Sequence, residues 1–352
     1  MASFGRFLQI GLALDPIHVG AGGARIGRVD LTIVRDPVTR IPKIPGSSLA
    51  GVYRTYVAMH FEEDRQQRGR AGEQVRQKPF YPDCAGLGID ENHGHCRQPD
   101  CSVCTVFGFA RGSDQEGGFA GLAAFTDAHV LLFPVPTRRG PMWVTSPMAL
   151  RLVSIEVAGV DDNAVYLRDG SSNQLNLGWL LLPVQEYAEI STITEPLQHL
   201  NIPDYILNRL ALVPDRLFAH IVNSNLEVRT SVSINPETGA AEDKALFSYE
   251  ALPRGTLLVW EIIAKNPQHF RISGQSITAV SSPNDVYEKA KQAHPYLKHL
   301  GIGGMGTRGM GRVEVVYPSE PAESQDTNCG ESPQEQQNSP GSSEQNEEAS
   351  HE

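Results

Sequence analysis

The chain has 352 residues, of which 40% are hydrophobic and 20% charged, and its formal net charge is −11. This composition is ordinary for a soluble globular protein, and the absence of an apolar run of about 18 residues argues against a membrane span. The N-terminal residues alternate in character and form no solid apolar block, so we expect no secretion signal and a cytoplasmic location.

Most of the negative charge lies at the C-terminus. Residues 318–352 contain nine Asp and Glu residues and no Lys or Arg, and subtracting these nine charges leaves −2 for residues 1–317. The segment is rich in Ser, Glu, Gln, Asn and Pro, so we predict a disordered acidic tail. The nearly neutral body does not exclude a nucleic-acid partner, because local basic patches can bind phosphate.

Strands and helices are predicted to alternate irregularly along the body. We expect strands at 4–14, 29–34, 119–135, 151–158, 256–264 and 312–317, and helices at about 49–63 and 284–299. Ser47 or Ser48 would cap the first helix. Residues 64–105 are polar and turn-rich and are interpreted as an insertion, whereas 229–253 can be a projecting hairpin or a surface loop. This order favours an α+β fold over a regular doubly wound sheet.

A glycine-rich loop precedes the second predicted strand and leads to a carboxylate, Asp30. Its glycines are Gly20, Gly22, Gly23 and Gly27. Glycine lets a backbone approach a phosphate chain closely, and the helix start that follows offers free N–H groups to anions. These features suggest binding of RNA or a nucleotide. On composition alone, Asp30 and Asp36 are more often turn-capping or Arg-paired carboxylates than catalysts.

A second glycine-rich loop, residues 301–312, has six glycines in twelve residues. Gly304, Gly306 and Gly309 satisfy the G-x-G-x-x-G pattern. A dinucleotide fingerprint needs a strand before the loop and a helix after it, and here the predicted order is reversed. We therefore interpret the loop as a backbone surface that, with Arg308 and Arg312, grips phosphates, the alternative being a flexible turn.

Four of the five cysteines fall within one short window. They are Cys84, Cys96, Cys101 and Cys104, with His93 and His95 between them. The two-residue gap between the last two allows both sulfurs to reach one tetrahedral ion, which favours structural zinc over disulfides in a cytoplasmic protein. Cys84, His93 or His95 can supply the fourth ligand, and unligated thiols remain the alternative.

The chain resembles the RAMP superfamily of CRISPR proteins, and most closely the repeated backbone subunit of type III-B (Cmr) effector complexes. The resemblance rests on five segments in the family's order. They are VDLTIVRDPVTRIPKIPGSSLAGVYR, CSVCTVFG, FTDAHVLLFPVPTRRGPMWVTSP, RTSVSINPETGAAEDKALFSYEALP and LGIGGMGTRGMGRVEV. One glycine-rich loop would be weak support, whereas five ordered segments are specific.

The resemblance implies a modified ferredoxin-like, RNA-recognition-motif-like RAMP core over residues 1–317, with a zinc-stabilised insertion at about 64–105. It also implies a thumb hairpin, assigned to about 224–250, that wedges into the duplex of guide CRISPR RNA and target single-stranded RNA. The partners implied are those two RNAs, copies of the chain itself and other RAMP subunits. The family's loop aspartate matches Asp30, which would promote magnesium- or other divalent-metal-dependent cleavage as a general base or a metal ligand.

The resemblance, with the loop patterns, nominates a set of RNA-binding residues. They are His18, Gly20, Gly22, Arg25, Lys43, Ser47, Ser48, Arg54, Gly304, Gly306 and Arg308. Where family members often carry lysine in the P-G-S-S-L-K-G motif, this chain has Ala50, so the phosphate contact is missing or comes from Lys43 or Arg54. The related type III-A subunit and a catalytically inactive guide-binding scaffold are the alternative functions.

Overall fold

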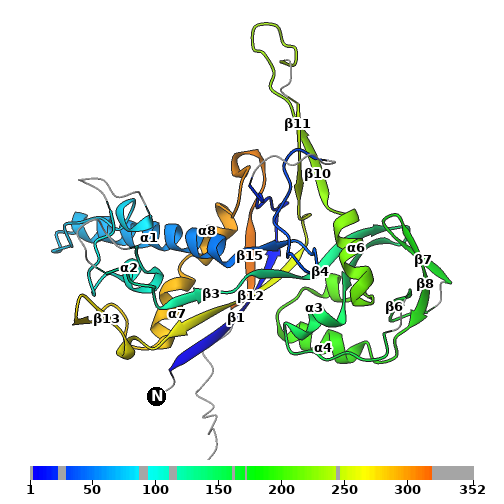
Figure 1. Ribbon diagram of the computed structural model, residues 1–352, viewed down its shortest axis with the longest axis horizontal. Helices are drawn as coiled ribbons and strands as arrows, with labels where there is room; N and C mark the ends of the chain where they lie inside the picture. The colour runs from blue at the N-terminus through cyan, green and yellow to red at the C-terminus, as the bar shows by residue number, and fades with distance from the viewer. Residues whose placement is uncertain are drawn as a thin grey trace, which may run out of the picture. The chain divides into compact units, whose positions relative to one another are not determined.

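The computed structural model describes residues 3–22, 29–86, 94–110, 117–160, 163–170, 173–242 and 246–318. Its architecture is α+β, with helices packed around a large mixed sheet (Figure 1), which confirms the predicted fold class. No helix in these ranges combines the length and apolar character needed to cross a membrane.

The sheet runs in the order β15-β1-β12-β4-β5-β9-β6-β8-β7, with β2 paired to β4 and β3 to β12. The strands are β1 (Phe4–Ala13), β2 (Lys43–Ile44), β3 (Ala123–Phe125), β4 (Ala128–Thr137), β5 (Gly140–Thr145), β6 (Val165–Leu167), β7 (Gln174–Leu177), β8 (Leu180–Glu186), β9 (Leu210–Leu212), β12 (Leu257–Lys265) and β15 (Val313–Pro318). β1 lies between β12 and β15 and is antiparallel to both, whereas β5–β9 and β6–β8 are parallel.

Two groups of helices pack against different parts of this sheet (Figure 1). Near β3 and β12 lie α1 (Gly46–Arg70), α2 (Ser102–Phe107), α7 (Pro283–Lys291) and α8 (His294–His299). Near β5–β9 lie α3 (Pro147–Arg151), α4 (Ser191–His199), α5 (Asp204–Leu207) and α6 (Asp215–Ser224). Stacking of Phe7 on Tyr287, with ring centroids 4.1 Å apart, ties β1 to α7. Two large apolar clusters thus form the core, as the alternating strands require.

The predicted strands at 4–14, 119–135, 256–264 and 312–317 are found as β1, β3 with β4, β12 and β15. The predicted strand at 29–34 is wrong, because this segment makes only isolated bridges, such as Leu31 with Tyr249 and Ile33 with Gly20. Its neighbours change from residue to residue, so no continuous ladder can propagate.

The predicted strand at 151–158 is also wrong. α3, which begins after the cap Ser146, ends at Arg151; residues 152–154 form a turn, and residues 155–158 join no strand. The N–H groups of Leu152, Val153 and Ser154 bond back to carbonyls of α3, so these residues continue as a turn and do not pair with a neighbouring strand.

The first helix is longer than predicted, and its cap is different. It spans α1, so residues 64–70 belong to the helix and not to an insertion. Neither Ser47 nor Ser48 caps it; Asp127 Oδ1 accepts from the Gly46 N–H at 2.8 Å instead. A Cβ at Gly46 would meet the Phe125 carbonyl oxygen at 2.3 Å, so only glycine permits this close start. The cap comes from the distant connection between β3 and β4, which no local pattern reveals.

The predicted helix at 284–299 is divided into α7 and α8. Pro295 lies in the first turn of α8, and because proline has no N–H it cannot continue the hydrogen-bond ladder of α7. The predicted order of a helix before the second glycine-rich loop and a strand after it is confirmed.

The segment 229–253 forms a hairpin of β10 (Glu227–Ser231) and β11 (Phe247–Ala251). The strands pair from Glu227 with Ala251 to Ser231 with Phe247. In Figure 1 this hairpin leaves the sheet and projects from it. Of the two alternatives that the sequence allows, the projecting hairpin is correct. A small further hairpin, β13 (Arg271–Ile272) with β14 (Gln275–Ser276), lies after β12.

Some of the predictions fall on residues that the structure does not describe. The predicted disorder of the tail concerns residues from 319 onward, and Arg25, Gly23, Gly27 and His93 also lie outside the described ranges.

Candidate functional site

Asp30 lies in an open pocket formed by three distant segments of the chain. The lining residues are Asp30, Leu31, Phe247, Met305, Gly306, Thr307 and Arg308. They come from the end of the first glycine-rich loop, the base of the β10–β11 hairpin and the second glycine-rich loop. The structure therefore brings the two loops that the sequence singled out to one surface, with a hairpin strand between them.

The carboxylate of Asp30 is exposed and held by Ser248 of β11. Ser248 donates to Oδ2 of Asp30 from its backbone N–H at 2.7 Å and from Oγ at 2.9 Å. These bonds, the backbone one first, lower the pKa of Asp30 because they stabilise the charged form. Both donors bond to Oδ2 and not to Oδ1, so they orient the carboxylate. Because its pKa is lowered, the carboxylate is ionised at neutral pH.

His18 joins the three segments behind the pocket. Its Nδ1 lies 2.6 Å from the Glu250 carbonyl oxygen, and its own carbonyl accepts from the Gly304 N–H at 2.8 Å. The residue is only 5% exposed, so His18 mainly supports the loops around the pocket. A Cβ at Gly303, which has φ +88°, would lie 2.4 Å from the His18 carbonyl oxygen, so this contact requires glycine.

The Glu250 side chain fixes the strand that carries Ser248. Its Oε2 accepts from Arg35 Nη2 at 2.8 Å and from the Ile33 N–H at 3.4 Å. This part-buried ion pair connects β11 to the segment just after Asp30. Sequence reasoning missed both Ser248 and Glu250, and the alternating pattern of the hairpin was the only signal that placed them on one strand.

The structure brings some of the nominated RNA contacts to the Asp30 pocket. Gly306 and Arg308 line it, and Gly304 and Gly20 adjoin it through bridges to His18 and Ile33. The guanidinium of Arg308 is exposed and lies 5.6 Å from the centroid of the Phe247 ring. Gly22 is also exposed, with φ +74°, and a Cβ at this position would have no atom within 4 Å of it.

The other nominated contacts lie elsewhere. Lys43 pairs with Asp127 at 2.7 Å and with Asp36 at 3.5 Å, and its side chain is only 17% exposed. Ser47 and Ser48 lie in the first turn of α1 and do not line the pocket. The ammonium group of Lys43 therefore already has two carboxylate partners, and its role in replacing the contact missing at Ala50 stays a prediction.

Arg54 is likewise turned inward. It donates to the carbonyl oxygens of Cys84 at 2.7 Å and Gly108 at 2.6 Å, and one of its nitrogens lies 3.0 Å from His95 Nδ1. Burial lowers the pKa of Arg54, yet these contacts keep the guanidinium bound within the protein. Arg54 therefore fastens the loop that carries Cys84, and its assignment as an RNA contact stays a prediction.

Asp36 is a turn-capping carboxylate, as its residue type and position predicted. Its Oδ1 accepts from the backbone N–H groups of Val38 at 3.0 Å and Thr39 at 2.9 Å. The Thr39 backbone bond is the main influence that lowers the pKa of Asp36. Asp36 is therefore committed to the turn, whereas the carboxylate of Asp30 is exposed in the pocket that the two glycine-rich loops share.

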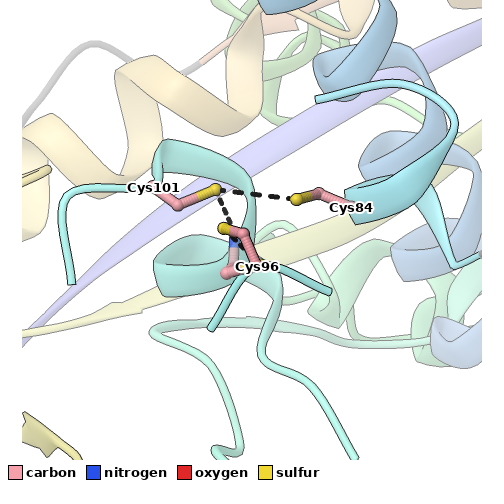
Figure 2. A group of neighbouring side chains, drawn as sticks. Cys84, Cys96 and Cys101 are labelled. Atoms are coloured by element: carbon pink, nitrogen blue, oxygen red, sulfur yellow. Dashed lines mark hydrogen bonds between the residues drawn. The ribbon is translucent and has the colours of Figure 1, made fainter. Parts of the chain in front are cut away.

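A second cluster contains Cys84, Cys96, Cys101 and Cys104, whose sulfur atoms all lie within 4.8 Å of one another. Figure 2 shows Cys84, Cys96 and Cys101 pointing toward one another from different segments. Cys84 lies in a short 3-10 helix, Asp83–Ala85; Cys101 is the N-cap of α2, and Cys104 lies within it. The cluster thus joins the end of a loop to the start of a helix.

The spacing of the sulfurs fits one tetrahedral ion. Cys96 Sγ and Cys104 Sγ are 3.7 Å apart, and Cys101 Sγ and Cys84 Sγ are 3.9 Å apart. Zn–S bonds of about 2.3 Å predict sulfur–sulfur edges of about 3.8 Å in a tetrahedron. These distances are too long for disulfides, and all four thiols are free. The group can therefore hold a metal such as zinc.

The structure also decides which residue completes this set. Cys84 is the fourth member of the group, and His95 is not part of it; the Nδ1 of His95 lies 3.0 Å from an Arg54 nitrogen instead. Burial lowers the pKa of His95 to about 4, so the ring is neutral at pH 7. Hydrogen bonds from Cys101 and Cys104 lower the pKa of Cys96, which favours the thiolate that binds metal.

Comparison with known proteins agrees with this geometry. The sequence profile of the RAMP superfamily matches residues 12–314. A protein of Pyrococcus furiosus named CRISPR system Cmr endoribonuclease Cmr4 is 26% identical over 322 residues, which cover 86% of this chain and 92% of that protein. A CRISPR system Cms endoribonuclease Csm3 of Methanothermobacter thermautotrophicus is 32% identical, but over 111 residues that cover 32% of each chain.

Solved structures share the fold at low sequence identity. A chain of the type III-B Cmr-beta complex bound to cognate target RNA has a TM-score of 0.57 at 17% identity, covering 89% of this chain and 98% of that one. A crystal structure of Cmr4 has a TM-score of 0.51 at 20% identity, covering 88% of this chain and 98% of that one. The whole described body therefore has a known architectural counterpart.

Proposed function

The chain belongs to the RAMP superfamily, and from this premise we propose that it is a backbone subunit of a type III-B CRISPR effector complex. In this role it binds guide CRISPR RNA and cleaves complementary target RNA at regular intervals in antiviral defence. The Cmr4 relative, aligned over 92% of its length, supports this assignment over the type III-A counterpart, whose aligned relative is matched over only 32%.

One observation carries the proposed activity: the exposed carboxylate of Asp30 at the base of the β10–β11 hairpin, in a pocket it shares with Arg308. The hairpin is the proposed thumb, assigned to about 224–250. It carries exposed apolar side chains at Val232, Ile234 and Leu246, which suit insertion between stacked bases. A base displaced by the hairpin frees the adjacent ribose to turn its 2′-hydroxyl toward the phosphate, next to Asp30.

The geometry favours a metal-holding role for Asp30 over a general-base role. An effective general base has a pKa near the working pH, whereas the bonds from Ser248 lower the pKa of Asp30. Among the described pocket residues Asp30 is the one carboxylate, which suits magnesium, since this ion keeps most of its waters and takes one or two carboxylates together with phosphate oxygens. When bound, the ion supplies positive charge and an activated water, and Arg308 is placed to receive the phosphate.

The remaining parts of the proposal concern RNA and architecture. The exposed backbones of Gly20, Gly22, Gly304 and Gly306 would follow the guide and target phosphates, and the chain would assemble with copies of itself and other RAMP subunits in the cytoplasm. Strands β1, β12 and β4 with α1 and α7 would form the modified ferredoxin-like core. The four cysteines would bind structural zinc and fasten the segment between α1 and α2.

The test is target cleavage by a complex reconstituted with one guide RNA. We expect Asp30→Ala to slow cleavage by about a hundredfold or more while guide and target binding persist, because the pocket loses its carboxylate. Asp64→Asn is the matched control, since Asp64 is an exposed carboxylate on α1 outside the pocket. Cleavage by the Asp30→Ala complex at the wild-type rate would refute the assignment. An inactive wild-type complex that still binds both RNAs would identify a guide-binding scaffold.

A further inference from the structure

A second pocket, with a volume of about 280 Å³, lies where β5 and β9 begin and β6 ends, and it shares no residue with the Asp30 pocket. It is lined by Arg139, Pro141, Met142, Leu167, Arg168, Asp169, Ile190, Leu207, Asn208, Arg209 and Leu210. These residues come from the β4–β5 turn, the end of β6 and the connections around α4 and α5. Its position in the sheet makes it independent of the proposed cleavage site.

Three arginines line this pocket, Arg139, Arg168 and Arg209. Arg139 forms an ion pair with Asp169 at 3.7 Å. Within the described ranges, Arg168 and Arg209 make no side-chain ion pair or hydrogen bond, so both are free to bind an anion. With one aspartate among three arginines, the lining carries a net charge of +2. This charge favours an anion and excludes a cation site.

The backbone of Arg209 is fixed by hydrogen bonds, and a glycine leaves space for its side chain. The Arg209 N–H donates to the Ile206 carbonyl at 2.9 Å, and its own carbonyl accepts from the Trp143 N–H at 2.8 Å. A Cβ at Gly140 would lie 3.1 Å from Nη1 of Arg209, and φ at this glycine is +91°. Glycine here leaves room for the guanidinium, so the arginine is presented to the pocket and not displaced from it.

The floor of the pocket is apolar. Leu167, Leu207 and Leu210 are 3%, 6% and 4% exposed, and Ile190 is 6% exposed. A flat apolar group can rest on these side chains while its charged end reaches the arginines at the rim. A planar base joined to a phosphate has this combination of properties.

We propose that this pocket binds a nucleoside monophosphate, either as a free mononucleotide or as the 5′-phosphorylated end of an RNA strand. The base lies on the leucines and isoleucine, and the phosphate takes bidentate hydrogen bonds from Arg168 and Arg209. A terminal phosphate carries up to two negative charges at neutral pH, which matches the net +2 of the lining, whereas an internal phosphodiester carries one. The site thus recognises an end and not the middle of a strand.

The experiment uses the full chain and calorimetric titration with four probes. These are AMP, adenosine, a five-nucleotide RNA with a 5′-monophosphate and the same RNA with a 5′-hydroxyl. We expect the phosphorylated member of at least one pair to bind about tenfold or more tightly than its unphosphorylated partner, because two charge-assisted bonds are made. Preference within the AMP pair alone identifies a free nucleotide as the ligand, and preference within the RNA pair identifies a strand end.

The double variant Arg168→Ala with Arg209→Ala should abolish this preference for the phosphate. Arg271→Ala is the control, because Arg271 is an exposed arginine outside the pocket, and it should keep the wild-type preference. Thermal melting of each variant verifies the fold. Equal binding of both members of both pairs by the wild-type chain overturns the proposal, as does a preference that survives the double substitution. Neither result depends on whether Asp30 cleaves RNA.

Discussion

The cysteine cluster and the Asp30 pocket are two candidate metal-binding regions of opposite construction. Three of the four cysteines are completely buried, and their sulfurs face one another at the distances of a closed tetrahedron. The Asp30 pocket is open, contains one carboxylate among its described lining residues and has an arginine beside it. The first arrangement fills every coordination position with protein, whereas the second leaves most of them to water or substrate.

This difference separates a structural metal from a reactive one. A closed set of four thiolates contributes its binding free energy to folding and offers no position to a substrate. A single oriented carboxylate contributes little to the fold, but it can act on a phosphate chain that arrives from outside. The comparison therefore predicts that damage to the first region lowers stability, and that damage to the second lowers activity without unfolding the protein.

The largest effect is expected from Cys101→Ala. Removing one thiolate opens the tetrahedron, so bound zinc should fall from about one per chain to near zero and the melting temperature should fall with it. Zinc content by mass spectrometry and thermal melting measure both quantities. Cys329→Ser is the control, since Cys329 is the one cysteine outside the cluster window. A wild-type chain without zinc, or a Cys101→Ala chain that retains it, would show that the cluster holds unligated thiols.

A smaller effect, about tenfold on the cleavage rate, is expected from Ser248→Ala, which removes a side-chain donor to Asp30 while leaving stability nearly unchanged. The Ser248 hydroxyl bond is one of the two bonds from this residue that lower the pKa of Asp30, and the backbone bond remains in the variant, so the pKa should rise only part of the way toward the ordinary value of about 3.9. The carboxylate is then protonated at a higher pH than in the wild type. The acid limb of the pH–rate profile should therefore shift toward higher pH.

Ser281→Ala is the matched control for this prediction, because Ser281 also donates to a carboxylate, that of Asp285, outside the pocket. Its cleavage rate and pH profile should equal those of the wild type. An unchanged rate and profile for Ser248→Ala would mean that the Ser248 hydroxyl does not influence the carboxylate.

The smallest effect is expected from Asp127→Asn, about 1 kcal/mol in the free energy of unfolding at pH 7. Burial raises the pKa of Asp127, but bonds from Lys43 and the Gly46 N–H outweigh it and the net change is downward. The ion-pair contribution is therefore present above the unfolded pKa of about 3.9 and is lost as pH falls through the folded pKa.

Chemical denaturation of wild type and Asp127→Asn at pH 7 and near pH 3 should thus show a difference at the higher pH that shrinks at the lower one. Asp64→Asn, whose pair with Arg68 is long at 4.0 Å and exposed, should show no difference at either pH. A gap that grows on acidification would contradict the assigned direction of the pKa change.

Local patterns predicted the elements that are held by their own residues. The alternation of β1 and β12 and the proximity of Cys101 to Cys104 follow from neighbours in sequence, and both are found. The prediction for 29–34 did not hold, because the partners of that segment are a loop and a hairpin strand. The inward turn of Arg54 was missed for the same reason, since its acceptors lie at Cys84 and Gly108.

By itself, the sequence determined the α+β class, the cysteine set with its open fourth member, the two glycine-rich loops and the importance of Asp30. Only the tertiary structure decided that these loops share one pocket, that Ser248 orients the carboxylate, that Cys84 completes the tetrahedron, and that Lys43 and Arg54 are already bound. The physical reason is that residue type and spacing set the local conformation and the kinds of bond a side chain can make. Whether a charged side chain is available to a ligand depends on partners that come from distant parts of the chain.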